Sequence, residues 1–366
     1  MNSISKKDFD NALKVVALSD ATQKYIRISG DGQKLVITAC AASEQARTHI
    51  SYKGDAFPEI AVNNRILGMC LSSFAEDEVG FYADSVFHLE DAKGMKFQLP
   101  LIEDKEVGLT FVEPDNTSLL GEFVVTEKME EKVKILPSVI EKDATRPFCM
   151  GVNLVAKGGK MTAFAAKPSA CIKQVLGPVS GNWEACVPAP FVGKMTEGTK
   201  ISIFKNVVKA ASKDGEFYAR LFAAADAATK LAGVFAKEPP VKVLIKRADV
   251  LSAFKAVSLL TNIGEGGHMT ACEISGVDTS TLILSANSDV AGHVEVPLKL
   301  MKPANIVGYH EGVDATFPLF LKARNSVLLS FGLGTISGGS PFSVSEETKG
   351  EEDDFQFVFM PMRVKK

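Results

Sequence analysis

A threefold internal repeat is the feature that most constrains how this sequence can fold. Each repeat starts with a segment whose apolar residues recur at the spacing of an amphipathic helix. The expected helices span residues 6–18, 126–142 and 246–261. Pro137 should kink or end the second helix, because a proline ring clashes with the preceding turn. A strand follows each helix, and these strands are anchored by Leu35, Met161 and Leu282.

Each repeat also holds a second short helix and further strands. The short helices are expected over residues 62–73, 187–198 and 296–309. Turn-rich joints lie at residues 113–121 and 236–242, and they divide the 366 residues into units of about 122 residues, an ordinary small-domain size. We therefore predict an α+β fold with three repeated domains, at residues 1–120, 121–240 and 241–366.

The chain ends in the sequence FQFVFMPMRVKK. Residues 355–359 are expected to form a last strand, and Met360, Pro361 and Met362 follow it. A frayed terminus would be polar, so this apolar ending has a structural or functional reason. One interpretation is a terminal strand tucked into a sheet. The other makes the Met-Pro-Met segment one wall of a groove that binds another protein.

Composition favours a globular protein of the cytoplasm. Hydrophobic residues make up 46% of the chain and charged residues 23%. The net charge of −3 gives no general attraction to nucleic acid, but it is compatible with a local basic lining. No apolar stretch approaches the length of a membrane-spanning helix, and acidic residues interrupt the N-terminal apolar pattern, unlike a signal peptide. The six cysteines are widely scattered, which is typical of free thiols in a reducing compartment.

The sequence contains none of the common motifs for catalysis or metal binding. The five histidines lie far apart, no cysteines form a C-x-x-C pair, and no phosphate-binding loop or nucleophile elbow is present. We therefore expect no cofactor, no metal and no enzymatic activity. These absences favour a topological or adaptor-like function.

Three stretches together resemble the bacterial DNA sliding clamp family, the beta subunit of DNA polymerase III, of which this chain would be a diverged member. They are the ending FVFMPMRV, the stretch RPFCMGVNLVAKGGKMTAFAA at residues 146–166, and ADVLSAFKAVSLLTN at residues 248–262. The resemblance implies the DNA clamp fold, in which two chains close head to tail into a ring. Helices would line the hole, antiparallel sheets would lie outside, and duplex DNA would pass through. Such a processivity factor is cytoplasmic and associated with the nucleoid.

The ring lining should carry basic residues that contact phosphates without reading bases, because specific contacts would stall sliding. The candidates are Lys14, Lys134, Lys142, Arg146, Lys194, Lys255 and Lys302. The alternative for each of them is an ordinary solvated helix face.

The resemblance also implies a hydrophobic cleft that binds short peptides of a DNA polymerase, the clamp loader and other replication or repair proteins. By matching position it would include Arg146, Cys149, Ala166, Pro168, Cys171, Pro240, Val358, Met360, Pro361, Met362 and Arg363. Methionines suit a shared docking site, since they repack around different ligands. The family usually carries an Asp-Gly-His-Arg-Leu-like stretch where residues 167–171 here read KPSAC, which predicts a differently shaped, less polar groove.

Two other classes of function compete with this interpretation. A non-enzymatic β-rich repeat protein with a structural or virion role would explain the repeat, and it predicts a filament or a monomer without a peptide groove. A metabolic enzyme with an unrecognised site would require a bound cofactor or turnover of a substrate. The structural class does not account for the basic helices or the Met-Pro-Met ending, and the sequence offers no nucleophile–base pair for an enzyme.

Overall fold

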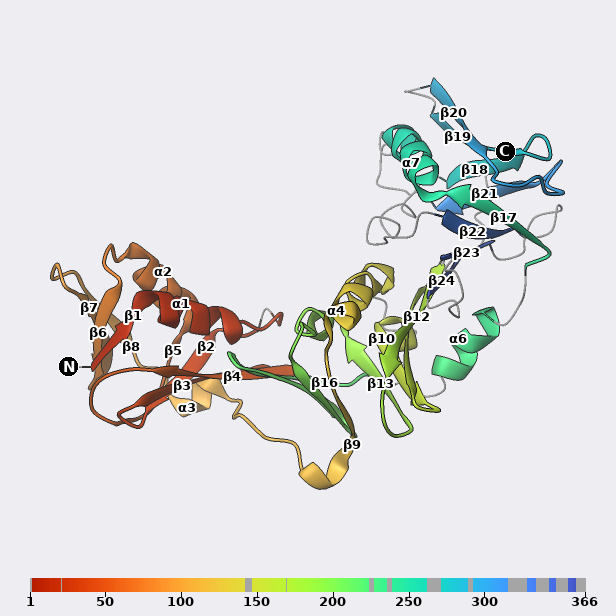
Figure 1. Cartoon of the computed structure of the whole chain (residues 1–366). Helices are drawn as coiled ribbons and strands as arrows, with labels where there is room; N and C mark the ends of the chain where they lie inside the picture. The colour runs from red at the N-terminus through yellow and green to blue at the C-terminus, as the bar shows by residue number, and fades with distance from the viewer. Residues whose placement is uncertain are drawn as a thin grey trace. The chain divides into compact units, whose positions relative to one another are not determined.

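The computed structural model describes residues 2–20, 22–141, 147–168, 170–223, 227–235, 239–261, 271–288, 292–314, 328–333, 342–346 and 355–359. Within these ranges the fold is α+β and its strands pair antiparallel (Figure 1). The chain divides into two compact units, Met1–Thr126 with Pro190–Leu221, and Glu127–Ala189 with Phe222–Lys366. Each unit contains a large sheet to which two repeats contribute strands, so the units do not correspond to single repeats. The three domain boundaries therefore stay a prediction.

The first unit contains two sheets. The larger has the strand order β5 (Phe57–Asn63), β2 (Tyr25–Gly30), β3 (Lys34–Cys40), β4 (Glu44–Ser51), β16 (Gly215–Arg220), β15 (Val207–Ser212), β14 (Lys200–Phe204) and β9 (Leu119–Val124). The smaller has the order β1 (Asn2–Ser5), β6 (Glu78–Ala83), β7 (Val86–Asp91) and β8 (Lys96–Pro100). The helices are α1 (Lys6–Val15), α2 (Asn64–Ser73), α3 (Asp104–Val107) and a 3₁₀ turn at Asn116–Ser118, while α5 (Ala189–Val192) lies at the boundary of the units.

The second unit repeats this plan. Its larger sheet has the order β13 (Trp183–Pro188), β10 (Gly151–Lys157), β11 (Lys160–Lys167), β12 (Ala170–Pro178), β24 (Phe355–Phe359), β23 (Phe342–Glu346), β22 (Leu328–Leu333) and β17 (Val241–Lys246). The smaller sheet has the order β20 (Gly292–Lys299), β19 (Thr281–Ser288), β18 (Ala271–Gly276) and β21 (His310–Asp314). The helices are α4 (Glu127–Val133), α6 (Ala227–Phe235) and α7 (Arg247–Thr261), with 3₁₀ turns at Leu136–Val139 and Pro147–Cys149.

The structure confirms the first helix of each repeat and the anchored strand, which is the second strand after that helix rather than the first. Helix α1 starts where the Ser5 hydroxyl accepts a hydrogen bond from the Asp8 N–H, and it ends three residues earlier than expected. Helix α4 ends at Val133, before Pro137, which lies in the following 3₁₀ turn. The strand anchors Leu35, Met161 and Leu282 lie in β3, β11 and β19, and all three are buried.

The second short helix is confirmed only in the first repeat. There Asn63 caps α2 by accepting a hydrogen bond from the Ile66 N–H at 3.0 Å, whereas its equivalent α5 has only four residues. The helix expected over residues 296–309 is wrong, because this segment forms the end of β20 and then turns. Val294, Val296 and Leu298 alternate with exposed residues at the period of a strand, and Pro297 is tolerated because β20 is an edge strand.

Two strand pairings join the repeats. In the first unit β4 pairs with β16, so that Arg47 lies opposite Glu216. In the second unit β12 pairs with the C-terminal strand β24, so that Cys171 lies opposite Val358 and Ala170 opposite Phe359. Residues 355–359 therefore form the expected last strand, and it lies inside the sheet rather than at its edge.

Charged side chains bind the β4–β16 pairing together. The Glu216 carboxylate lies 2.6 Å from Arg47 and 2.6 Å from Lys209, and it accepts a hydrogen bond from the Tyr218 hydroxyl at 2.9 Å. Burial by itself would raise the pKa of Glu216, but the hydrogen bonds from Lys209, Arg47 and Tyr218 outweigh it and lower this pKa to about 2. The carboxylate is therefore charged throughout the neutral range.

We expect the Glu216→Gln substitution to lower the free energy of unfolding by about 1–3 kcal/mol at pH 7, because it leaves Arg47 and Lys209 without their shared carboxylate. The folded-state pKa lies below the ordinary value of 4.5, so the stabilisation is present above that value and is lost as the pH falls toward about 2. Urea unfolding at pH 7 and pH 2 measures both effects. Glu76→Gln, which removes an exposed ion pair with Lys93, is the control and should cost far less.

Candidate functional site

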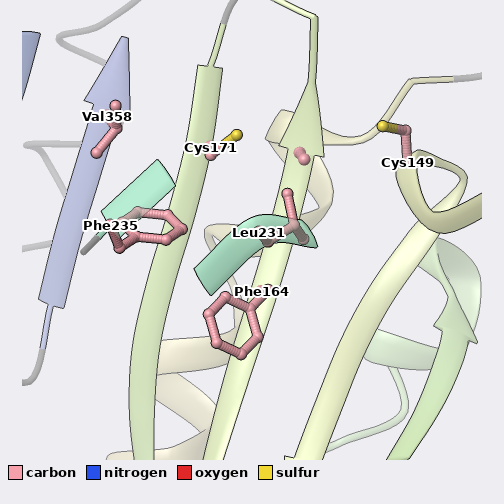
Figure 2. Close-up of a cluster of buried hydrophobic side chains, with 7 residues drawn as sticks. Cys149, Phe164, Cys171, Leu231, Phe235 and Val358 are labelled. Carbon is pink, nitrogen blue, oxygen red and sulfur yellow. The ribbon is translucent and has the colours of Figure 1, made fainter. Parts of the chain in front are cut away.

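A group of buried side chains in the second unit forms the strongest candidate site. We call it the apolar cluster, and it consists of Cys149, Phe164, Ala166, Cys171, Leu231, Phe235 and Val358 (Figure 2). Its members come from the Pro147–Cys149 turn, from strands β11, β12 and β24, and from helix α6. Residues from distant parts of the chain therefore meet at one place on the larger sheet.

Strand register explains how the floor of the cluster is built. Ala166 on β11 lies opposite Cys171 on β12, and Cys171 lies opposite Val358 on β24. Directly opposed residues project from the same face of a sheet, so these three side chains form a row across the junction between the repeats. The adjacent turn that carries Cys149 is held by the Asn153 amide, which donates a hydrogen bond to the Phe148 carbonyl at 2.8 Å.

Helix α6 covers this floor. Leu231 and Phe235, four residues apart and therefore on one face of the helix, are both buried in the cluster. Figure 2 shows the two side chains beside Phe164 and Cys171. The rings of Phe164 and Phe235 have their centroids 6.1 Å apart and are inclined at 47°. Phe148, Val155 and Val234 pack around the cluster as half-buried neighbours.

The chemistry of the cluster suits apolar contact rather than catalysis. Burial raises the pKa of the Cys171 thiol to about 12, and the neighbouring Cys149 contributes to this rise, so the thiol stays neutral. Within the described residues no group of three or more His, Cys, Asp or Glu side chains is placed to hold a metal ion. No helix in the same ranges is long and apolar enough to span a membrane.

The structure brings together part of the cleft expected from the sequence. Cys149, Ala166, Cys171 and Val358 all belong to the apolar cluster. Pro168 and Pro240 are exposed and lie outside it. The remaining expected members, Arg146, Met360, Pro361, Met362 and Arg363, lie outside the described residues.

Sequence reasoning missed helix α6 and its contribution to the cluster. The signal was present, because Leu231, Val234 and Phe235 recur at helical spacing in an alanine-rich stretch. Phe164, which contacts Phe235, was also missed, since nothing in a strand sequence shows which of its residues a distant helix will cover.

The basic residues expected on helices have varied surroundings. Lys14 on α1 and Lys255 on α7 are exposed, and exposed Lys134 forms an ion pair with Glu130 at 2.7 Å. Lys194 follows α5 and is half-buried, with its ammonium 4.9 Å from the centroid of the Phe217 ring, and burial lowers its pKa. Lys302 lies in a turn rather than on a helix. Lys142 and Arg146 lie outside the described residues.

The fold of this chain is similar to that of several solved bacterial proteins. The DNA polymerase sliding clamp of Bacillus subtilis aligns over 100% of this chain and 99% of its own, with a TM-score of 0.84 and 13% identity. The sliding clamp of Pseudomonas aeruginosa aligns over 100% of both chains, with a TM-score of 0.81 and 16% identity. The Helicobacter pylori beta clamp bound to a DNA ligase peptide aligns over 99% of this chain and 100% of its own, with a TM-score of 0.82 and 16% identity. No family model matches the sequence, and no curated protein sequence matches it significantly.

We expect Cys171 to react with iodoacetamide at pH 8 at least about 100-fold more slowly in the folded protein than in urea, because its thiolate fraction is small and the cluster covers it. Peptide mapping by mass spectrometry after timed labelling measures the rate. Equal rates in the folded and unfolded protein would show that Cys171 is not covered as described.

Proposed function

We propose that this chain, which has the fold of the bacterial sliding clamps, is itself a DNA sliding clamp that works as a polymerase processivity factor. Two copies would close into a ring around duplex DNA and tether a DNA polymerase. The protein would have no catalytic residues of its own and would act as an accessory subunit in the cytoplasm, on the nucleoid. The main observation behind this proposal is that both junctions between repeats pair equivalent strands in the same way.

Both junctions inside the chain follow the same rule. The third strand after the first helix of one repeat, β4 or β12, pairs with the last strand of the next repeat, β16 or β24. Among the described strands that this rule concerns, β8 is the last strand of the first repeat and β20 is the equivalent of β4 and β12 in the third, and both lie at sheet edges without a partner from another repeat. Pairing β20 of each copy with β8 of the other satisfies the rule and closes a two-chain ring in which both of these edges are covered.

The hydrogen-bond pattern identifies which groups face these edges. The Asp91 N–H donates to the Met95 carbonyl, and hydrogen-bonded pairs alternate along an antiparallel ladder, so the N–H groups of Lys96 and Gln98 point away from β7. The Leu300 N–H donates to the Ser280 carbonyl, so the N–H groups of Glu295 and Lys299 point away from β19. Both edges therefore offer backbone groups for pairing.

Exposed lysines on equivalent helices support the DNA-binding part of the proposal. Lys14 and Lys255 lie on the first helices of the first and third repeats, and Lys134 directly follows that of the second. Charges of this kind attract phosphates without reading sequence. Lys142, Arg146, Lys194 and Lys302 remain further candidates.

The apolar cluster would form part of the cleft for partner peptides. The solved Helicobacter pylori clamp is bound to a DNA ligase peptide, so a protein of this fold has been seen with such a ligand. In this chain Phe359 lies opposite Ala170 at the end of β24, and Met360, Pro361 and Met362 follow it in the sequence. We propose that residues 360–363, Arg146 and the cluster together bind peptides of a polymerase, a clamp loader and other replication proteins, with Pro168 and Pro240 as outlying members.

We expect the purified protein to sediment as a dimer of about twice its 39.2 kDa chain mass and to appear as a closed ring by negative-stain electron microscopy. Gln98→Pro should weaken the dimer at least about tenfold, because it removes an outward-facing N–H while leaving the bonds of β8 to β7. Gln98→Ala keeps the N–H and is the matched control.

Sedimentation over a concentration series measures both variants, and circular dichroism checks their folding. Filaments or monomers at all concentrations would favour the structural repeat protein instead of the clamp.

We expect Lys14→Ala combined with Lys255→Ala to reduce the slope of log affinity for duplex DNA against log salt by about 0.9 for each phosphate that the protein no longer neutralises. Fluorescence anisotropy with two duplexes of unrelated sequence measures the slope and its independence of sequence. The control is Lys93→Ala with Lys105→Ala, which removes equal charge from exposed positions with acidic partners. An equal reduction of the slope in both double variants would refute a DNA-facing role for α1 and α7.

A further inference from the structure

We propose that helix α6 is a built-in occupant of the peptide cleft, which must leave the apolar cluster before a partner peptide can bind. This inference rests on the proposed function, because it takes the cluster to be part of the partner site. It adds a regulatory element formed by the chain itself. The competing ligand would be a short peptide that presents an aliphatic and an aromatic side chain.

The first argument is that α6 and a partner peptide would need the same space. Leu231 and Phe235 are buried against the row formed by Ala166, Cys171 and Val358 and against Phe164. The cluster is therefore already filled with an aliphatic and an aromatic side chain from one short segment. A second segment with the same pair of side chains cannot enter while α6 is docked, because protein interiors leave no room for both.

The second argument is that α6 is weakly held as a helix. It has nine residues, fewer than an isolated helix needs to be stable in water, so its helical form depends on docking. Gly233 lies near its centre and is exposed, and a β-carbon there would meet no atom within 4 Å. Packing therefore does not require this glycine, although glycine disfavours a helix relative to alanine by about fivefold in the equilibrium constant.

The third argument is thermodynamic. If a partner binds only the open form, its apparent affinity falls by the fraction of molecules in which α6 is undocked. A substitution that changes the stability of α6 must then change peptide affinity, even when it touches no cluster residue. Gly233→Ala is such a substitution, because its side chain would lie on the exposed face.

The experiment compares wild type, Gly233→Ala and Phe235→Ala in the full-length chain. The probe is a fluorescein-labelled synthetic peptide with the α6 sequence AATKLAGVF. We expect Phe235→Ala to bind it at least about tenfold more tightly than wild type, and Gly233→Ala about fivefold more weakly. Gly68→Ala is the matched control, because Gly68 lies in α2, where a β-carbon also meets no atom within 4 Å. It should leave peptide affinity unchanged.

Iodoacetamide labelling of Cys171 gives a second readout that needs no peptide. We expect the rate to rise in Phe235→Ala and to fall about fivefold in Gly233→Ala, because docking of α6 covers the thiol. Gly233→Ala replaces an exposed glycine by a better helix former, so it tests the proposal even if Phe235→Ala folds poorly.

The outcomes separate this inference from the proposed function. If all variants bind the probe equally and label equally, α6 is not an occupant, and the cleft itself is untouched by that result. If the labelling rates of Cys171 change as expected but no variant binds the probe, α6 opens without uncovering a peptide site. That result overturns both the inference and the assignment of the cluster to the cleft. The inference is supported if Phe235→Ala binds the probe more tightly and is labelled faster, while Gly233→Ala binds it more weakly and is labelled more slowly.

Discussion

Backbone pairing between strands of neighbouring repeats is the interaction on which the rest of this structure depends. A single repeat offers two half-sheets with open edges, and an open edge is prone to indiscriminate pairing. Joining β4 to β16 and β12 to β24 converts these halves into two eight-stranded sheets. The same pairings set where side chains meet. Without the β12–β24 register, Val358 would not lie beside Cys171, and the apolar cluster would lack one side of its floor.

The two junctions use one topology with opposite side-chain chemistry. Opposed residues Arg47 and Glu216 make the β4–β16 junction ionic, and Lys209, Tyr218 and Glu113 extend its network. The β12–β24 junction opposes Cys171 to Val358 and is apolar on that face. The charges of the ionic junction neutralise one another, whereas an apolar surface is stabilised when another apolar group covers it. That difference is consistent with our proposal of a cleft at the second junction, where α6 covers the apolar row.

Local periodicity predicted much of this fold. The anchors Leu35, Met161 and Leu282 and the strand at residues 355–359 were identified because turn residues and short apolar runs are local signals. Cys149, Ala166, Cys171 and Val358 were expected together only through the family resemblance. All four lie in the apolar cluster, where strand register aligns the last three. Two errors have physical causes. The segment of Val294, Val296 and Leu298 was assigned to a helix although it alternates as a strand. Helix α6 was overlooked because its partners are distant in sequence, and a short helix owes its stability to such partners.

The position of β24 has a consequence for how the chain is made. This strand is formed by residues 355–359, yet it lies between β12 and β23 inside the larger sheet of the second unit. On the ribosome, β12 emerges long before β24 and must wait with its edge unpaired while the whole third repeat is synthesised. A nascent or truncated product therefore displays both that edge and the apolar floor beside it, which are the features that chaperones and proteases recognise. Synthesis of β24 is therefore the step that allows this edge of β12 to be covered.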